Sequence, residues 1–241
     1  MQGTLTMLNK YSDNVYYSDY GLYDDRPVLG YIKGDRYALM VDAGNSEAHA
    51  REFLAEVEKK GLPKPDFVVL THYHWDHTFG LSALDIPSFA SEETYELINR
   101  APKEWSNELF RKYCEEGIIE PFCQEHMAYE YPDFSVIRIA LPTITFKEEL
   151  KIDLGNQPVL FKKQVNPHST DGVIVYAEKE RVVFLGDSTS LELKGPDWVK
   201  HPDKLQKLYD YLETLDYDTC FHCHFDPIKK ANLYDWLKDN F

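Results

Sequence analysis

The first third of the chain alternates short apolar runs with one amphipathic stretch. Residues 28–32 and 37–42 are rich in apolar side chains, and the Lys-Gly-Asp-Arg sequence between them is a hairpin turn signal. From Ser46 to Lys60 apolar residues recur at helical spacing, and Gly61 is placed to end that helix. Pro65 then introduces an apolar run at 67–70, which we expect to be a buried strand. A strand, a helix and a strand in this order predict a mixed sheet covered by helices.

The second half of the chain repeats this scheme. Apolar runs at 173–176 and 182–185 flank a Glu-Lys-Glu-Arg turn, and residues 202–215 have a helical pattern. The first hairpin ends in Met-Val-Asp-Ala-Gly at 40–44, and the second ends in Phe-Leu-Gly-Asp-Ser at 184–188. This weak internal similarity indicates two related halves, and 241 residues suit a single α/β domain, 1–241.

Residues 91–150 follow neither half. Ser91 is placed to cap a helix through Arg100, and residues 105–116 predict a second helix. The stretch 119–131 is rich in aromatic residues, and we expect Pro121 and Pro132 to interrupt its regularity. We interpret 91–150 as a largely helical insertion that partly covers the functional site and shapes substrate choice. Its aromatic residues are candidates for pocket walls, although packing in a core is the commoner explanation for any one of them: Trp105, Phe110, Tyr113, Phe122 and Tyr129.

Composition narrows the class of protein and its partners. The net charge is −15 and the Lys and Arg residues are scattered, so we expect no nucleic-acid partner. No apolar run is long enough to cross a membrane, and residues 1–6 show no signal-peptide pattern. With only four cysteines, the sequence favours a cytoplasmic protein with reduced thiols. We expect a small-molecule substrate, and the sequence leaves the oligomeric state open.

The most informative motif is Thr-His-Tyr-His-Trp-Asp-His at 71–77, directly after the apolar run at 67–70. Imidazole nitrogens and carboxylate oxygens are the ligands that zinc takes at catalytic sites. His72 and His74 can point one way while Asp76 and His77 reach another way. A run of ligands this compact must therefore serve more than one metal centre. This arrangement suggests two metal ions a few ångströms apart that hold and activate one water.

Further candidate ligands follow later apolar runs. His168 lies in an Asn-Pro-His-Ser-Thr turn, and Asp187 follows Phe-Leu-Gly. His222 and His224 both lie in the late sequence Cys-Phe-His-Cys-His-Phe. Each lies on a loop beside an expected strand, where sheet proteins commonly place their chemistry.

In this order the motifs resemble the metallo-β-lactamase superfamily, from about residue 28 to residue 230. The resemblance implies a four-layer αβ/βα sandwich, in which two mixed β-sheets are flanked by helices. It also implies that one metal is bound by His72, His74 and His168, and a second by Asp76, His77 and His224, with Asp187 as the bridge. The position in the turn favours His224 over His222 as the late ligand. Asp42, which ends the first hairpin, is either a plain turn residue or a support for a loop or ligand histidine.

The resemblance implies a metal-dependent hydrolase, with Asp76 and Asp187 orienting the attacking water. Two zinc ions are the expected cofactors, with iron or manganese as alternatives. Among the family's branches, the glyoxalase II and lactonase ligand sets are the most similar. However, glyoxalase II has a basic C-terminal helical region, whereas only 17 residues follow His224 here. The lactonases have a tyrosine shortly after the bridging Asp, where this chain has Ser-Thr-Ser at 188–190. A true β-lactamase with a Cys ligand is disfavoured because Asp187 occupies the bridging place.

The substrate class therefore stays broad: a small ester, thioester, lactone or phosphodiester. Two alternatives remain. One is a single-iron oxidoreductase similar to persulfide dioxygenases, which keep similar ligands, and the other is a non-catalytic metal-binding or sensor module. The sequence does not identify the physiological substrate, the native metal, or a contribution of His222 to the site.

Overall fold

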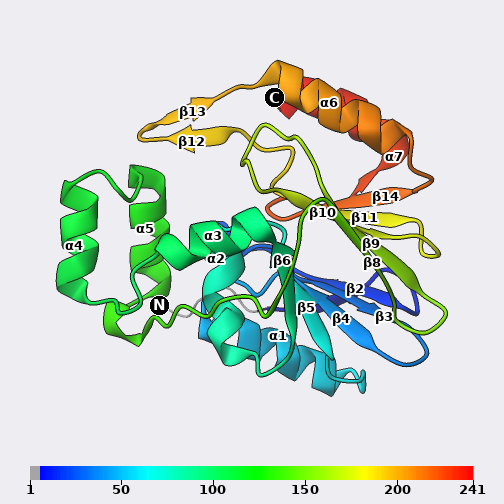
Figure 1. The fold of residues 1–241 in the computed structure, drawn as a ribbon, viewed down its shortest axis with the longest axis horizontal. Helices are drawn as coiled ribbons and strands as arrows, with labels where there is room; N and C mark the ends of the chain where they lie inside the picture. Colours follow the sequence, from blue (N-terminus) through cyan, green and yellow to red (C-terminus); the bar gives the residue numbers. More distant parts are fainter. Residues whose placement is uncertain (1–5, 241) are drawn as a thin grey trace.

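A computed structural model describes residues 6–240 as two large β-sheets packed face to face between helices (Figure 1). The expected absence of a signal peptide rests on residues 1–6, of which only Thr6 is described. The first sheet has seven strands in chain order: β1 (Leu8–Lys10), β2 (Val15–Ser18), β3 (Gly30–Lys33), β4 (Ala38–Val41), β5 (Phe67–Val69), β6 (Ser88–Ser91) and β7 (Ile144–Phe146). Strands β1 to β4 are antiparallel, and β4 to β7 are parallel.

The second sheet has six strands: β15 (Ile228–Lys229), β14 (Thr219–His222), β11 (Val182–Gly186), β10 (Val173–Ala177), β9 (Pro158–Lys163) and β8 (Glu149–Asp153). Only the pair of β11 and β14 is parallel. A separate hairpin, β12 (Glu192–Lys194) with β13 (Asp197–Val199), extends from the sandwich after β11. Both large sheets are therefore mixed, as expected.

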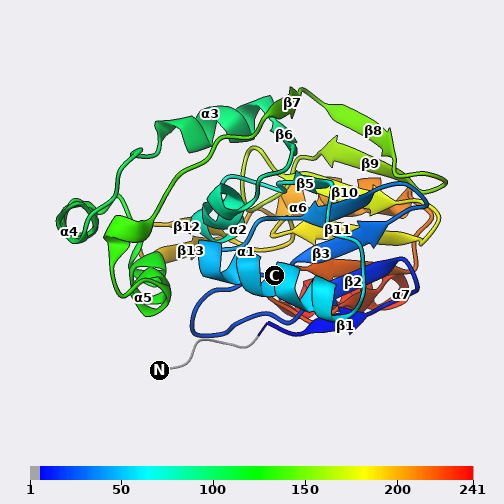
Figure 2. The same cartoon turned by 90° about the horizontal axis from the view of Figure 1, so that it is seen from below.

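Helices cover the outer faces of both sheets (Figures 1 and 2). Helix α1 (Glu47–Lys59) packs on the first sheet, and α6 (Pro202–Glu213) and α7 (Lys230–Asn240) pack on the second. Shorter helical segments are α2 (Trp75–Thr78), η1 (Phe79–Ala83), α3 (Glu92–Arg100) and η2 (Phe134–Val136). Within residues 6–240, no helix has both the length and the apolar character needed to cross a membrane.

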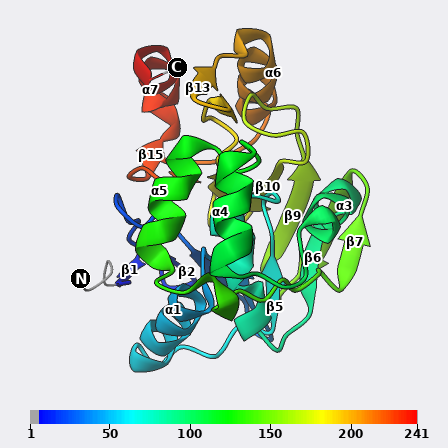
Figure 3. The same cartoon turned by 90° about the vertical axis from the view of Figure 1, so that its left-hand side faces the viewer.

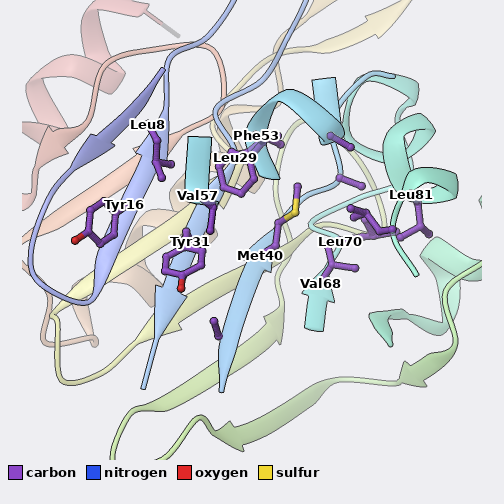
Figure 4. Packing of buried hydrophobic residues seen from close by; sticks show 14 of the residues in the cluster. Leu8, Tyr16, Leu29, Tyr31, Met40, Phe53, Val57, Val68, Leu70 and Leu81 are labelled. Carbon is purple, nitrogen blue, oxygen red and sulfur yellow. The ribbon is translucent and has the colours of Figure 1, made fainter. Parts of the chain in front are cut away.

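Apolar packing lies at each of the three interfaces between these four layers. One cluster joins α1 to the first sheet through Phe53, Val57 and Met40 (Figure 4). A second fills the space between the sheets, and a third joins the second sheet to α6 and α7. The four-layer sandwich expected from the sequence is confirmed. Because the sheets are buried on both faces, β4, β10 and β11 consist of buried residues throughout.

The sequence predicted several of these elements closely. The Ser46 side chain caps α1 by accepting from the His49 backbone N–H, and the Ser91 side chain caps α3 in the same way at Thr94. Gly61, at φ 67°, follows the end of α1. The helix expected at 105–116 is α4 (Asn107–Glu115), so Trp105 lies before its start.

The expected irregularity of 119–131 is wrong, because this stretch contains α5 (Pro121–Glu130). Pro121 occupies the first turn of the helix, where its missing N–H has no helical partner to lose. Within the segment 91–150, α3 lies against β6 and β7, and β7 is a strand of the first sheet. The part that leaves the sandwich is therefore about 101–143, with α4 and α5 at one side of the molecule (Figure 3).

Candidate metal centre

The sheet topology brings the candidate ligands to one edge of the sandwich. Strands β4 and β5 are parallel, so Asp42 and the 71–77 loop leave the first sheet at the same end. Strands β11 and β14 are parallel, so Asp187 and His224 leave the second sheet together. The loop that carries His168 enters β10, which is antiparallel to β11 and therefore begins at that same end. A hydrogen bond from the Val173 N–H to the Thr71 carbonyl, 2.7 Å, joins the two edges.

Three histidines form the first group of candidate ligands. His74 Nδ1 lies 3.0 Å from His72 Nε2 and 2.9 Å from His168 Nε2. His72 and His168 are buried, whereas His74 is partly exposed. Three ring nitrogens from two separate loops thus converge on one small space.

Two carboxylates and two histidines form the second group. Asp76 Oδ2 lies 2.9 Å from His77 Nε2 and 3.2 Å from His224 Nε2. Helix α2 begins at Trp75, and it places Asp76 and His77 side by side in its first turn. His224 is the most exposed member, with 22% of its side chain exposed.

Asp187 is the second carboxylate of this group, and it also faces the first group. Its Oδ2 is 3.5 Å from both His77 Nε2 and His224 Nε2, and 3.6 Å from His168 Nε2. The preceding Gly186 allows this approach: it has φ 54°, and a Cβ there would lie 2.5 Å from Thr71 Oγ1. One carboxylate oxygen therefore reaches histidines of both groups.

Other groups hold the far side of the imidazoles. Asp42 Oδ2 lies 2.9 Å from His77 Nδ1 and also accepts from the Thr71 hydroxyl. The Leu191 carbonyl accepts from His168 Nδ1 at 2.8 Å. Asp25 Oδ1 lies 3.7 Å from His224 Nδ1. Contacts of this kind fix the orientation of a ligand ring, so Asp42 is placed to hold a candidate ligand, which is one of its two expected roles.

Cys223 completes a third cluster with Asp42 and His77, in which its thiol lies 3.8 Å from Asp42 Oδ2. This cluster uses Nδ1 of His77, whereas Nε2 faces Asp76. Burial raises the pKa of Cys223, so the thiol is protonated near neutral pH and acts as a donor to Asp42. We regard it as part of the support behind His77.

The two groups differ in their protonation. Burial, followed by the charge of His168, lowers the pKa of His74 to about 3, and burial lowers the pKa of His72 well below its ordinary value. Burial alone would also lower the pKa of His77, but Asp76, Asp42 and Asp187 outweigh it and raise that pKa. Without a metal, His72 and His74 are thus neutral, and His77 carries a proton.

The carboxylates of the second group mirror this effect. Burial alone would raise the pKa values of Asp76 and Asp187, but His77 and His224 outweigh it and lower both. The pKa of His224 is raised, because Asp187, Asp76 and Asp25 together outweigh its burial. The second group is therefore a buried cluster of opposite charges.

The donor set fits two divalent cations. Ligand atoms about 2.0–2.1 Å from a tetrahedral zinc lie roughly 3.3 Å from one another, and the contacts named above within the two groups are 2.9–3.5 Å. His77 Nε2 is buried without a hydrogen bond of sound geometry. A buried polar atom without a hydrogen bond is costly, and a bound cation would satisfy its lone pair.

His222 lies outside both groups. Its Nδ1 contacts the Thr189 hydroxyl at 2.8 Å, and its ring packs on Trp236 at 4.6 Å between centroids. Burial lowers its pKa to about 4, so it is a neutral side chain of the interior.

Three of the five aromatic candidates, Trp105, Phe110 and Tyr113, lie in the core of the insertion. Trp105 packs on Phe79 and Tyr113, and Phe110 stacks on Phe134 at 3.7 Å between centroids. Trp105 is only 8% exposed. Contact of Trp105, Phe110 or Tyr113 with a substrate stays a prediction.

Sequence reasoning missed three features beside the site. Asp25 precedes β3 on an irregular loop, at φ 52°, and only its position next to Asp24 marked it. Leu191 contributes a backbone carbonyl, which no side-chain pattern reveals. Tyr73, inside the motif, lies with its ring 4.6 Å from that of His74 and is 37% exposed. Its place between His72 and His74 was the available sequence signal.

Comparisons with known proteins agree with this architecture. A family model described as the metallo-beta-lactamase superfamily matches residues 28–224. A comparison with curated proteins gave no match. Among solved structures, a metallo-beta-lactamase from Pontibacter korlensis is 17% identical, with a TM-score of 0.69 and 97% of each chain covered. The stereoselective inverting sec-alkylsulfatase Pisa1 from Pseudomonas sp. is also 17% identical, with a TM-score of 0.70.

The match to the sulfatase covers 98% of this chain but 41% of that one. At these identities the structural likeness shows the fold alone. The family match spans the strands and loops that carry every candidate ligand, from β3 to His224. The chain belongs to the metallo-β-lactamase superfamily.

Proposed function

We propose that this protein is a metal-dependent hydrolase that uses two divalent cations, zinc first among them, with iron or manganese as alternatives. The observation that carries this proposal is the position of Asp187. Its Oδ2 lies 3.5–3.6 Å from histidines of both candidate ligand groups. A carboxylate shared in this way supports a dinuclear centre and disfavours a single structural ion.

Two cations bound there would lower the pKa of a water molecule and polarise an oxygen of the substrate. The chain itself supplies the ligands and the orientation. Asp76 and Asp187 present carboxylate oxygens at the same place, so they can orient the water and accept its proton. Asp42 and the Leu191 carbonyl hold their histidines from behind.

The reaction class follows from these groups. Water adds to an electrophilic carbon, phosphorus or sulfur, and the bond to the leaving group breaks. The sequence has no Gly-x-Ser-x-Gly motif for a serine nucleophile. The proposed substrates are small esters, thioesters, lactones and phosphodiesters, and the similarity in fold to a sec-alkylsulfatase adds secondary alkyl sulfates to those worth testing.

The net charge of −15 disfavours nucleic acid as a partner, so the nuclease branches of the superfamily receive little support. We also propose a cytoplasmic location, because all four cysteines are free.

The test is a hydrolysis panel with zinc-, iron- and manganese-loaded protein. The panel contains one small substrate of each proposed class. Oxygen uptake is measured separately with a persulfide as substrate. Hydrolysis that is lost in Asp187→Asn and kept in Asp226→Asn supports the proposal, because Asp226 is exposed outside both groups. Oxygen uptake with one iron per chain would replace it with the oxidoreductase alternative. Tightly bound metal without any turnover would favour the binding or sensor module.

A further inference from the structure

Two elements from distant parts of the chain flank the exposed side of the site. His74 and His224 are the partly exposed ligands, one in each group. Tyr73, next to His74, is 37% exposed. Helix α5 approaches this side from the insertion, and the β12–β13 hairpin approaches it from the second sheet (Figures 1 and 3).

The start of α5 borders the ligands. Cys123 packs in the same cluster as Trp75, the first residue of α2. Burial, and then the charges of Asp76 and Asp25, raises the pKa of Cys123, which places this thiol near the second group. The first turn of α5 therefore lies beside α2 and Asp76.

The far end of α5 is fixed to the sandwich. Arg26, 5% exposed, donates to both carboxylate oxygens of Glu130 at 3.1–3.2 Å and to Glu52 on α1. The Tyr131 hydroxyl donates to the Asn45 carbonyl. Paired and buried contacts of this kind favour one geometry, so the C-terminal end of α5 is anchored to the sandwich.

The hairpin begins at the site. Leu191, whose carbonyl accepts from His168 Nδ1, directly precedes β12. Glu192 on β12 bonds to His201 Nε2 at 2.5 Å, which closes the base of the hairpin. The hairpin is thus fixed at its base to a candidate ligand.

The two elements meet through one aromatic contact. Phe122 on α5 and Trp198 on β13 lie edge to face, with centroids 5.2 Å apart. Unlike Trp105 in the core, they are 37% and 46% exposed. Phe122 also stacks on His126 at 4.1 Å. The contact leaves apolar ring surface facing water, where a ligand can cover it.

The charges around this side are acidic. Glu192 on β12 directly follows Leu191, whose carbonyl bonds to His168. Asp25 lies beside His224. Lys194 pairs with Glu192 at 3.2 Å and offsets one of these charges. A further negative charge on a ligand would be repelled here.

We propose that Phe122 and Trp198 are specificity-determining residues that bind a neutral, apolar acyl or alkyl chain of the substrate. This proposal rests on the proposed function, and it narrows the substrates to neutral apolar esters, lactones or related compounds. It disfavours substrates whose distal part is anionic. The metal-binding end of the substrate would lie between His74 and His224, with the chain along the exposed rings.

The test uses three hydroxamates that share one metal-binding head group: acetohydroxamate, octanohydroxamate, and suberic monohydroxamate, in which a carboxylate replaces the terminal methyl of the octanoyl chain. Their affinities for zinc-loaded protein are measured by calorimetry. We expect octanohydroxamate to bind at least about tenfold more tightly than either of the others. Phe122→Ala and Trp198→Ala should each reduce the octano-to-aceto affinity ratio at least about threefold, with acetohydroxamate unchanged.

The matched control is Tyr234→Ala, which removes the exposed ring of the aromatic pair Tyr209–Tyr234 on the outer helices. It should leave the ratio unchanged, and Trp198→Phe should retain most of it. Zinc content and circular dichroism establish that each variant is folded and loaded. Equal binding of the three hydroxamates to the wild type, or a ratio unaffected by both alanine substitutions, overturns the proposal. Because binding is measured, failure of the hydrolysis panel does not decide this result.

Discussion

The two candidate ligand groups are neighbours with opposite electrostatic characters. The first group consists of three imidazoles, those of His72, His74 and His168, and burial lowers the pKa values of His72 and His74. The second contains two carboxylates, which raise the pKa values of His77 and His224. A metal ligand must be deprotonated. A cation at the second group therefore has to displace protons from His77 and His224, whereas His72 and His74 in the first group hold no such protons.

This difference indicates how one centre can use two cations differently. His72 and His74 of the first group can bind a cation at neutral pH without losing a proton, whereas His77 and His224 of the second group exchange protons for their cation. Asp187 connects them, since its oxygen contacts histidines of both. Changes at Asp187 should therefore affect both groups, and changes elsewhere should separate them.

The largest expected effect is that of Asp187→Asn. The amide keeps the shape but loses the charge shared by both groups, so we expect hydrolysis to fall about a thousandfold or more. Metal content should fall by about one equivalent. Steady-state rates and elemental analysis measure these changes, with Asp226→Asn as the control. Activity within about threefold of the wild type would remove Asp187 from the mechanism.

The next effect compares two nearby histidines. His224→Ala should lose the second cation and most activity, because His224 Nε2 lies 3.2 Å from Asp76 Oδ2. His222→Ala should keep both cations, because that ring contacts Thr189 and Trp236 instead. Metal content after dialysis distinguishes them. The reverse pattern would move the ligand by two residues along the chain.

A smaller effect is expected behind the ligands. Asp42→Asn weakens the contact that holds His77 Nδ1, so affinity for the second cation should fall about 10–100-fold while the first is kept. Asp25→Asn should act in the same direction through His224 but more weakly, since its contact is 3.7 Å. Competition with a chelator measures both affinities. Equal loss of both cations would indicate a general loss of structure.

The pH dependence should separate the groups without any substitution. As the pH falls, His77 and His224 take up protons first because their pKa values are raised, so the second group should lose its cation first. The pKa of His74 is lowered to about 3, so protons compete with a cation for His74 only in stronger acid. Metal release followed from about pH 8, above the pKa of an ordinary histidine, down to about pH 3, near the pKa of His74, should show two steps. A single step that releases both cations would contradict the comparison.

Sequence reasoning identified the side chains of both groups because they lie in short motifs after apolar runs. The parallel pairs β4–β5 and β11–β14 then bring these loops to one edge, which is a consequence of topology. The structure brings the seven predicted ligands together in the two expected sets, and metal binding itself stays a prediction.

The surroundings of the site were harder to predict for physical reasons. Helix α5 has apolar residues on all sides and a proline in its first turn, so its sequence shows no helical period. The contact of Phe122 with Trp198 joins residues from separate elements, and no local pattern encodes it. Leu191 acts through its backbone. Long-range packing, rather than local propensity, determines these parts.

The central claim is that two cations bind, one in each group. The most direct measurement is a zinc titration of metal-free, folded protein by calorimetry, with elemental analysis of the dialysed product. We expect about two equivalents per chain at neutral pH, with proton release accompanying the second. Fewer than about one tightly bound equivalent in folded protein, or two equivalents without any proton release, would contradict the account.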